Sequence, residues 1–220
     1  MIENNLAEIK KSIPDDVKLV AVSKTKPNSA ILEAYEAGHR IFGENRVQEL
    51  TEKQEDLPKD IEWHMIGHLQ TNKVKYIAPF VALIHGVHKF KLLKEIDKQA
   101  KKVGRVIDVL IQFHIAQEDT KFGFDFDEAK EMLASDDFLA LQNINIRGVM
   151  GMATFTDNKE QIADEFRTLN NYFQVFKSNF FKFNDEFNIV SMGMSGDYEI
   201  AIEEGSNMIR VGSAIFGSRK

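Results

Sequence analysis

Short apolar runs alternate with helical stretches along the whole of this 220-residue chain. The runs are rich in Val, Ile and Leu and lack the polar alternation of a strand with one wet face. Each is therefore predicted to be a strand buried on both sides. The stretches between them carry apolar residues at intervals of three and four, which is the spacing of a helix packed along one face. Strand and helix in strict alternation indicate a parallel sheet.

Eight strands are predicted in this way, over residues 17–24, 40–42, 62–66, 81–85, 106–113, 146–150, 188–192 and 208–211. The predicted helices cover residues 2–13, before the first strand, and then 28–38, 45–55, 71–78, 89–102, 127–134, 159–180 and 197–204. Eight units in a chain of this length favour an α/β fold, a (β/α)8 TIM barrel with an extra N-terminal helix. The alternative is an open Rossmann-like sheet, but no GxGxxG follows the first strand. We expect residues 1–220 to form a single domain.

The helix predicted over 159–180 carries an unusual number of aromatic residues. Its apolar positions step by three and four: Ile162, Phe166, Leu169, Phe173, Phe176 and Phe180. This spacing favours burial against the sheet, and the alternative is an exposed aromatic binding surface.

The chain has no cysteine and a formal net charge of −6. The lack of cysteine excludes disulfides, thiolate metal sites and a cysteine nucleophile, and it fits a reducing compartment. A negative net charge gives no general reason to bind nucleic acid or an acidic membrane. The N-terminus lacks the pattern of a signal peptide, and no apolar run is long enough to span a bilayer. We expect a cytoplasmic protein.

Polar residues follow the predicted strands, and in a barrel these positions converge on one mouth. Lys24 ends the first strand, and Glu44 and Asn45 follow the second. Partial desolvation at a strand end can lower the pKa of an amine toward its nucleophilic, neutral form. Lys24 is therefore a candidate Schiff-base lysine, and the alternative is a solvated lysine that merely ends a strand.

Glycine and serine residues follow the last two strands: Gly193, Ser195, Gly196, Gly212 and Ser213. Barrels often hold phosphate at this place, where glycines permit close backbone approach and hydroxyl groups donate hydrogen bonds. The alternative is a pair of ordinary strand-to-helix turns. Arg210 lies in the last strand beside them. Directed into the mouth it would be a functional residue, because a buried guanidinium needs a partner, and directed outward it would be a surface residue.

Five segments carry a resemblance to a known family: AVSKTKP, FGENRVQE, EWHMIGHLQTNK, TKFGF and SMGMSGDYEIAIEEGSNMIRVGSAIFG. In these segments the chain resembles the pyridoxal phosphate homeostasis proteins. These are single-domain relatives of the barrel domain of alanine racemase and of eukaryotic ornithine decarboxylase. The segments span nearly the whole chain, and their order and spacing make the match specific.

The resemblance implies that pyridoxal 5′-phosphate (PLP) is held as a Schiff base on Lys24, with Asn45 beside the cofactor. It implies further contacts from the end of the chain, with the phosphate on Ser195, Gly212 and Ser213 and the pocket lined by Met192 and Gly193. Arg210 would face the pyridine nitrogen. A fixed positive charge there keeps that nitrogen unprotonated and weakens the ring as an electron sink.

The chain departs from the family pattern after two strands. Residues 85–88 read HGVH where a serine and an acidic residue usually follow strand four, and His114 stands where an asparagine usually ends strand five. His64 and His68 lie close enough in sequence to suggest a metal site, but Gly67 and the strand-to-loop setting argue against one helical face. We interpret the histidines as polar lining or satisfied neighbours, and we predict no metal.

Three functions remain open. The first is a non-catalytic carrier or buffer in PLP (vitamin B6) homeostasis, a monomer without catalytic residues that passes PLP transiently to apo-enzymes. We expect no second domain that would supply the opposing acid–base group of a two-base racemase, which favours this function. The second is a PLP-dependent amino-acid racemase or lyase. The third is a Schiff-base aldolase acting on a phosphosugar, for which Glu44 is one of few candidate acid–base groups.

Overall fold

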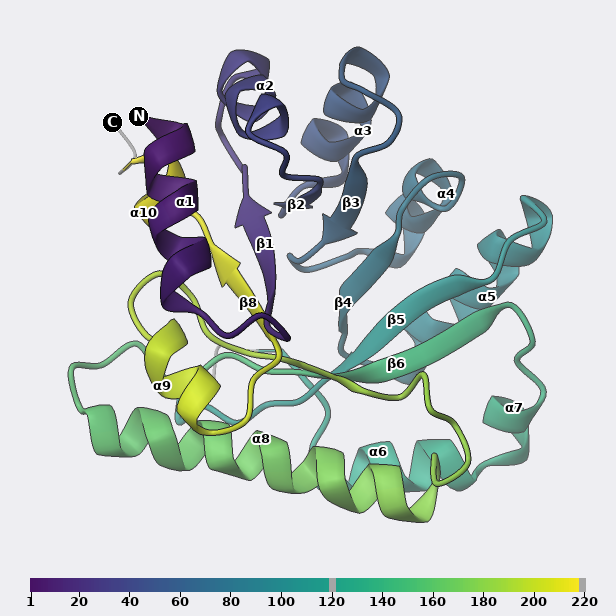
Figure 1. The fold of residues 1–220 in the computed structure, drawn as a ribbon. Coiled ribbons are helices and arrows are strands. Elements are labelled where there is room, and N and C mark those ends of the chain that lie inside the picture. The colour runs from purple at the N-terminus through teal and green to yellow at the C-terminus, as the bar shows by residue number, and fades with distance from the viewer. Residues whose placement is uncertain (119–121, 218–220) are drawn as a thin grey trace.

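The strands form a closed parallel barrel in strand order β1 to β8 (Figure 1). The protein is represented by a computed structural model, which describes residues 1–118 and 122–217. The strands are β1 Lys18–Val22, β2 Ile41–Glu44, β3 Glu62–Met65, β4 Leu83–Val87, β5 Ile107–Gln112, β6 Ile144–Met150, β7 Ile189–Ser191 and β8 Met208–Val211. The predicted TIM barrel with a leading helix is confirmed.

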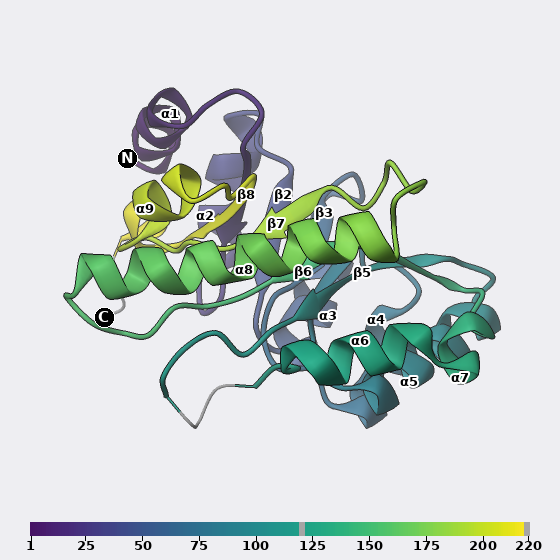
Figure 2. The same ribbon diagram turned by 90° about the horizontal axis from the view of Figure 1, so that it is seen from below.

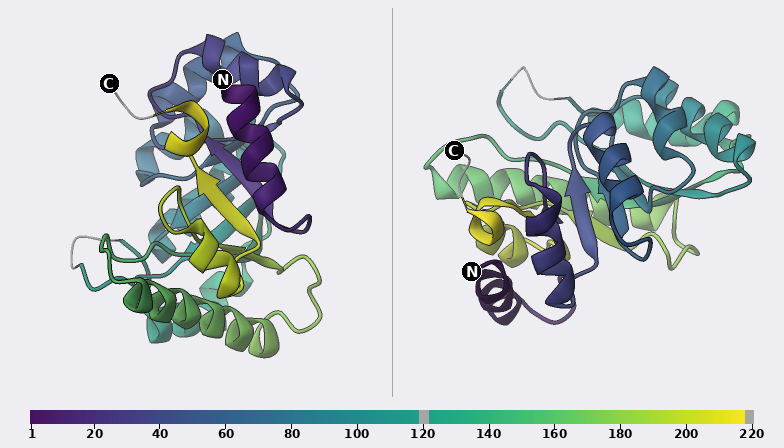
Figure 3. Two further views of the ribbon diagram at one scale, coloured as in Figure 1. Left: turned by 60° about the vertical axis from the view of Figure 1, so that its left-hand side comes forward. Right: turned by 90° about the horizontal axis from the view of Figure 1, so that it is seen from above.

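Helices surround the barrel on its outer side (Figures 1 and 3). They are α1 Ile2–Ser12, α2 Asn28–Glu36, α3 Val47–Asp56, α4 Val74–Ile77, α5 Phe90–Lys102, α6 Phe126–Ala134, α7 Asp136–Leu139, α8 Lys159–Asn179, α9 Tyr198–Glu203 and α10 Ser213–Phe216. The helix predicted over 71–78 is instead a 3-10 turn, Thr71–Lys73, followed by the single turn of α4. The sequence analysis did not predict the short helices α7 and α10.

Apolar residues pack in two separate layers. The larger core lies between strands and helices, and the smaller one fills the barrel interior with Val20, Leu83, Leu110, Met150, Ile189 and Met208. The aromatic stripe of α8 belongs to the larger core, because Phe166 and Phe176 are fully buried there. Helix α8 lies across β6 and β7 (Figure 2). The prediction that this stripe is core material is confirmed.

The two ends of the chain close the barrel together. Strand β1 pairs with β8 from Lys18 opposite Met208 to Ala21 opposite Val211. Helix α1 packs on α10 (Figure 3). The Asn5 side-chain amide donates to the Ile215 carbonyl at 2.9 Å. No helix within the described ranges is long and apolar enough to cross a membrane.

Candidate functional site

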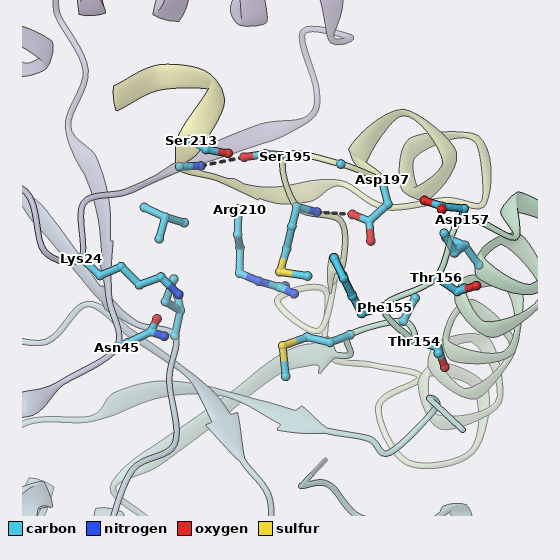
Figure 4. A pocket seen from close by; sticks show the side chains of 18 of the residues that line it. Lys24, Asn45, Thr154, Phe155, Thr156, Asp157, Ser195, Asp197, Arg210 and Ser213 are labelled. Carbon is cyan, nitrogen blue, oxygen red and sulfur yellow. Dashed lines mark hydrogen bonds between the residues drawn. The ribbon is translucent and has the colours of Figure 1, made fainter. Parts of the chain in front are cut away.

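A cavity of about 770 Å³ lies at the carboxyl ends of the strands. Arg210 of β8 and residues that follow β1, β2, β7 and β8 line it together: Lys24, Asn45, Ser195, Gly212 and Ser213. Figure 4 shows Lys24 beside Asn45 on one wall, Ser195 and Ser213 on another, and Arg210 between these groups. Six of the eight candidate binding residues from the sequence analysis therefore meet at one cavity.

The backbone on both sides of Lys24 is held by a buried polar cluster behind the cavity wall. The Lys53 ammonium donates to the Ser23 carbonyl at 2.8 Å and to carboxylate oxygens of Glu44 and Glu49 at 2.7 and 2.6 Å. The Ser23 hydroxyl donates to Glu44 at 2.6 Å, and the Thr25 N–H donates to Glu49 at 2.5 Å. Because the residues flanking it are fixed, the half-buried side chain of Lys24 enters the cavity from a rigid point.

Glu44 does not line the cavity, contrary to the expectation that it faces the mouth. Its side chain is fully buried in the Lys53 cluster, and one of its oxygens, Oε2, has no hydrogen-bond partner among the described residues. Burial raises the pKa of Glu44, and the charge and hydrogen bond of Lys53 oppose that rise. Glu44 is therefore a structural partner of Lys53 and no acid–base group of the cavity.

The ends of β7 and β8 come together at the serine and glycine residues. The Gly212 N–H donates to the Ser195 hydroxyl oxygen at 3.1 Å, which joins the two segments directly (Figure 4). A Cβ atom on Gly212 would lie 3.1 Å from the Val22 carbonyl oxygen, tighter than ordinary contact, so a side chain is poorly accommodated there. Ser195 and Ser213 add two hydroxyl groups to this wall of the cavity.

Arg210 lies on the cavity floor with its side chain 3% exposed. Its Nη1 donates to the Ser191 hydroxyl at 2.6 Å and its Nη2 to the Gly151 carbonyl at 3.0 Å. Burial lowers the pKa of Arg210 to about 10, opposed by the charge of Asp197, so the guanidinium remains charged at neutral pH. The outward-facing alternative for Arg210 is wrong.

Comparisons with known proteins show the family of the chain. The whole chain, residues 1–220, matches the family model described as alanine racemase, N-terminal domain. A pyridoxal phosphate homeostasis protein of Aquifex aeolicus is 41% identical over 204 residues, which cover 92% of this chain and 87% of that protein. The chain belongs to the pyridoxal phosphate homeostasis protein family.

Further relatives extend the match. The pyridoxal phosphate homeostasis protein of Escherichia coli K12 is 34% identical over 232 residues, covering 99% of this chain and 97% of that protein. Among solved structures, PipY of Synechococcus elongatus PCC7942 with PLP bound has a TM-score of 0.89 at 34% identity. That alignment covers 99% of this chain and 100% of PipY. The resemblance stated from the sequence segments is confirmed.

Two candidate residues of this family member lie behind the cavity wall. Met192 is fully buried in the outer core, and neither Met192 nor Gly193 is among the described residues that line the cavity. Gly193 has φ +96°, and a Cβ there would lie 2.6 Å from the Ala201 Cβ. Met192 follows Ser191, which faces the barrel interior, so the alternation of a strand turns Met192 outward to the helices.

The sequence analysis missed one wall of the family member's cavity, the loop after β6. Thr154, Phe155, Thr156 and Asp157 line this wall, and the Phe155 side chain is 97% exposed (Figure 4). The buried Glu165 of α8 holds the loop, accepting from the Thr154 N–H at 2.6 Å and from its hydroxyl at 2.7 Å. The signal was available, because GMATFTD, residues 151–157, directly follows the sixth predicted strand.

Four of the six histidines of this family member lie in two groups, and His39 and His114 lie apart from them. His64 and His85 are buried inside the barrel. His68 and His88 lie beside Phe122 with their rings tilted, and the ring centroids of His68 and Phe122 are 4.2 Å apart. No group of three or more His, Cys, Asp or Glu residues suited to a metal ion occurs within the described residues.

Proposed function

We propose that this protein binds PLP in the cavity, held covalently through Lys24, and acts as a carrier or buffer in PLP homeostasis. The observation that carries the proposal is the meeting of a rigidly mounted Lys24, the Ser195–Gly212–Ser213 wall and a buried Arg210 at one cavity. The family of the chain and the PLP-bound relative from Synechococcus support it.

The residues present suit PLP in size and in chemistry. A cavity of about 770 Å³ is within the range of small-molecule sites, roughly 300–1,000 Å³. We propose that the Lys24 amine bonds the aldehyde carbon with loss of one water, and that Asn45 lies beside the ring. Ser195, Gly212 and Ser213 would hold the phosphate, and Arg210 would face the ring nitrogen. When bound, PLP supplies an electron sink for carbanions at an amino acid.

The lining residues favour binding over catalysis. The Arg210 guanidinium disfavours a second positive charge at the ring nitrogen, which weakens the electron sink. Among the described lining residues, the carboxylates are Asp157 and Asp197, and no tyrosine, histidine or cysteine occurs there. Asp197 is engaged by the Met194 N–H at 2.5 Å. We therefore propose a non-catalytic role over the racemase or lyase alternative.

We further propose that residues 1–220 are one PLP-binding domain that acts as a monomer in the cytoplasm. PLP would pass transiently to apo-enzymes, since an imine bond to a lysine exchanges with other amines. The pairing of β1 with β8 supports one domain, and the net charge of −6 gives no reason to expect nucleic acid as a partner.

The visible spectrum of the purified protein with PLP, followed by borohydride reduction and peptide mapping, tests the proposal. We expect a band that reduction bleaches, with the adduct on Lys24. Lys24→Ala should give no adduct at residue 24 but should still bind PLP more weakly through Ser195, Gly212 and Ser213. No band in the wild type, or an adduct scattered over surface lysines, would reject PLP binding at Lys24 and favour the phosphosugar alternative. PLP-dependent exchange of the α-proton of an amino acid in D2O would instead favour the racemase or lyase.

A further inference from the structure

A row of four polar side chains crosses the barrel interior beneath the cavity. His64 of β3, His85 of β4, Ser191 of β7 and Arg210 of β8 are 4%, 0%, 0% and 3% exposed. His64 Nδ1 lies 3.0 Å from His85 Nε2, and His85 Nδ1 lies 3.0 Å from the Ser191 hydroxyl oxygen. That oxygen accepts from Arg210 at 2.6 Å. The row, named here the buried relay, ends at the cavity floor.

The donors and acceptors of the four groups allow only one direction for the hydrogen bonds along the buried relay. Arginine has only donors, so the Ser191 oxygen accepts from Arg210. The Ser191 hydroxyl then has one proton to donate, and His85 Nδ1 is the remaining partner among its described contacts. His85 therefore carries its own proton on Nε2 and donates it to His64 Nδ1. The reverse order would leave the Ser191 proton without an acceptor among these contacts, which is costly in a buried site.

The two imidazoles of the buried relay are neutral. Burial lowers the pKa of His64 to about 3, and Lys18 adds to the shift. Burial also holds the pKa of His85 well below its ordinary value, and repulsion from a protonated His64 and from the Arg210 guanidinium would act in the same direction. The positive charge of the buried relay therefore resides on Arg210 alone, at the end that meets the cavity.

We infer that Ser191 and His85 are positioning residues that fix the Arg210 guanidinium so that its remaining N–H groups face the ring nitrogen of the bound ligand. This inference rests on the proposed function. Strands β3 and β4, which supply the two histidines of the buried relay, lie across the barrel from Arg210. The hydrogen bonds therefore hold the guanidinium from the opposite wall. A braced arginine keeps one orientation, whereas an exposed one samples many rotamers.

Ligand discrimination tests the inference. PLP is compared with its 1-deaza analogue, in which C–H replaces the ring nitrogen, on the wild type, Ser191→Ala and Ser206→Ala. Ser206 is a matched control, a buried serine whose hydroxyl bonds the carbonyls of Val190, Met192 and Met208 outside the relay. We expect the ratio of the affinity for PLP to the affinity for the analogue to fall about tenfold in Ser191→Ala. Ser206→Ala should keep that preference even if both affinities fall.

An unchanged preference in Ser191→Ala would overturn the inference while leaving PLP binding in place. Failure of the wild type to bind PLP at Lys24 would overturn the proposed function itself. A second measurement needs no variant: nitrogen-15 NMR of the wild-type histidines should find the protons of His64 and His85 on Nε2. Protons on Nδ1 of His85 would reverse the assigned direction and overturn the inference even if Ser191→Ala did not fold.

Discussion

Lys53 and Glu44 form a buried ion pair, 2.7 Å between Nζ and Oε1, behind the strand end that carries Lys24. The side chains are 6% and 0% exposed. A salt bridge removed from water contributes little net stability, but breaking it leaves a buried charge without a partner.

Lys53→Met is therefore expected to destabilise the protein by about 3–5 kcal/mol at pH 7. Urea unfolding measures the change. The control is Lys98→Met, because the Lys98 side chain is 62% exposed and should change stability by no more than about 0.5 kcal/mol. Equal stability of the two variants would contradict the structural role of Lys53.

Gly212→Ala should weaken PLP binding, because the new methyl group crowds Val22 and moves the segment that carries Ser213. We expect a loss of about tenfold, as for one hydrogen bond to a charged group. Gly196→Ala is the comparison, since a Cβ at Gly196 meets nothing within 4 Å, and its loss should be smaller. Titration of the cofactor absorbance measures both. Similar losses would show that crowding at Val22 is not the cause.

Acid should destabilise the protein through His39, which is 5% exposed and whose Nε2 donates to the Ile41 carbonyl at 2.8 Å. Burial, with smaller effects from Lys10 and Arg40, lowers its pKa from 6.5 to about 4. Between these values the unfolded chain binds the proton and the folded chain does not, so stability falls as pH drops below 6.5.

The contribution of His39 to the stability lost between pH 7 and pH 5 is about 2 kcal/mol. His39→Gln keeps a donor for Ile41 and does not titrate. Its unfolding free energy should therefore fall by about 2 kcal/mol less than that of the wild type over this range. An identical pH dependence of the two proteins would reject this origin of acid sensitivity.

Phe155→Ala is expected to leave the stability of the protein nearly unchanged but to speed the release of PLP. The ring is 97% exposed, so its loss should change the unfolding free energy by no more than about 0.5 kcal/mol. Because the ring lines the cavity, its removal should speed release of PLP, measured by transfer to an excess of an amine trap. Phe183→Ala removes an equally exposed ring, 94%, away from the cavity. Equal release rates in both variants would remove Phe155 from the binding site.

The barrel and six of the eight candidate binding residues were predictable because their signals are local. Lys24 follows a β-branched run, and glycines and serines follow the last two strands. Once the strands are parallel, all these residues lie at the same end of the barrel. The same logic failed for Glu44, since its partner Lys53 lies on the next helix, one turn beyond Glu49. Nothing in the strand itself distinguishes a carboxylate at the mouth from one paired behind it.

The fourth strand illustrates a second limit. The sequence analysis ended it at His85, whereas β4 continues to Val87. His85 is tolerated in the barrel interior because Ser191, more than a hundred residues later, satisfies its Nδ1. A prediction made from the propensities of neighbouring residues cannot take account of so distant a partner.

The pairing of β1 with β8 determines when the site can form during synthesis. Lys24 leaves the ribosome early, but the wall formed by Gly212 and Ser213 follows only after β8, and β1 has no β8 to pair with until then. A growing chain therefore exposes Lys24, the proposed Schiff-base lysine, before the rest of its pocket has formed. We therefore expect PLP to bind only after β8 has paired with β1, and a defect that delays this pairing would leave Lys24 exposed to other aldehydes.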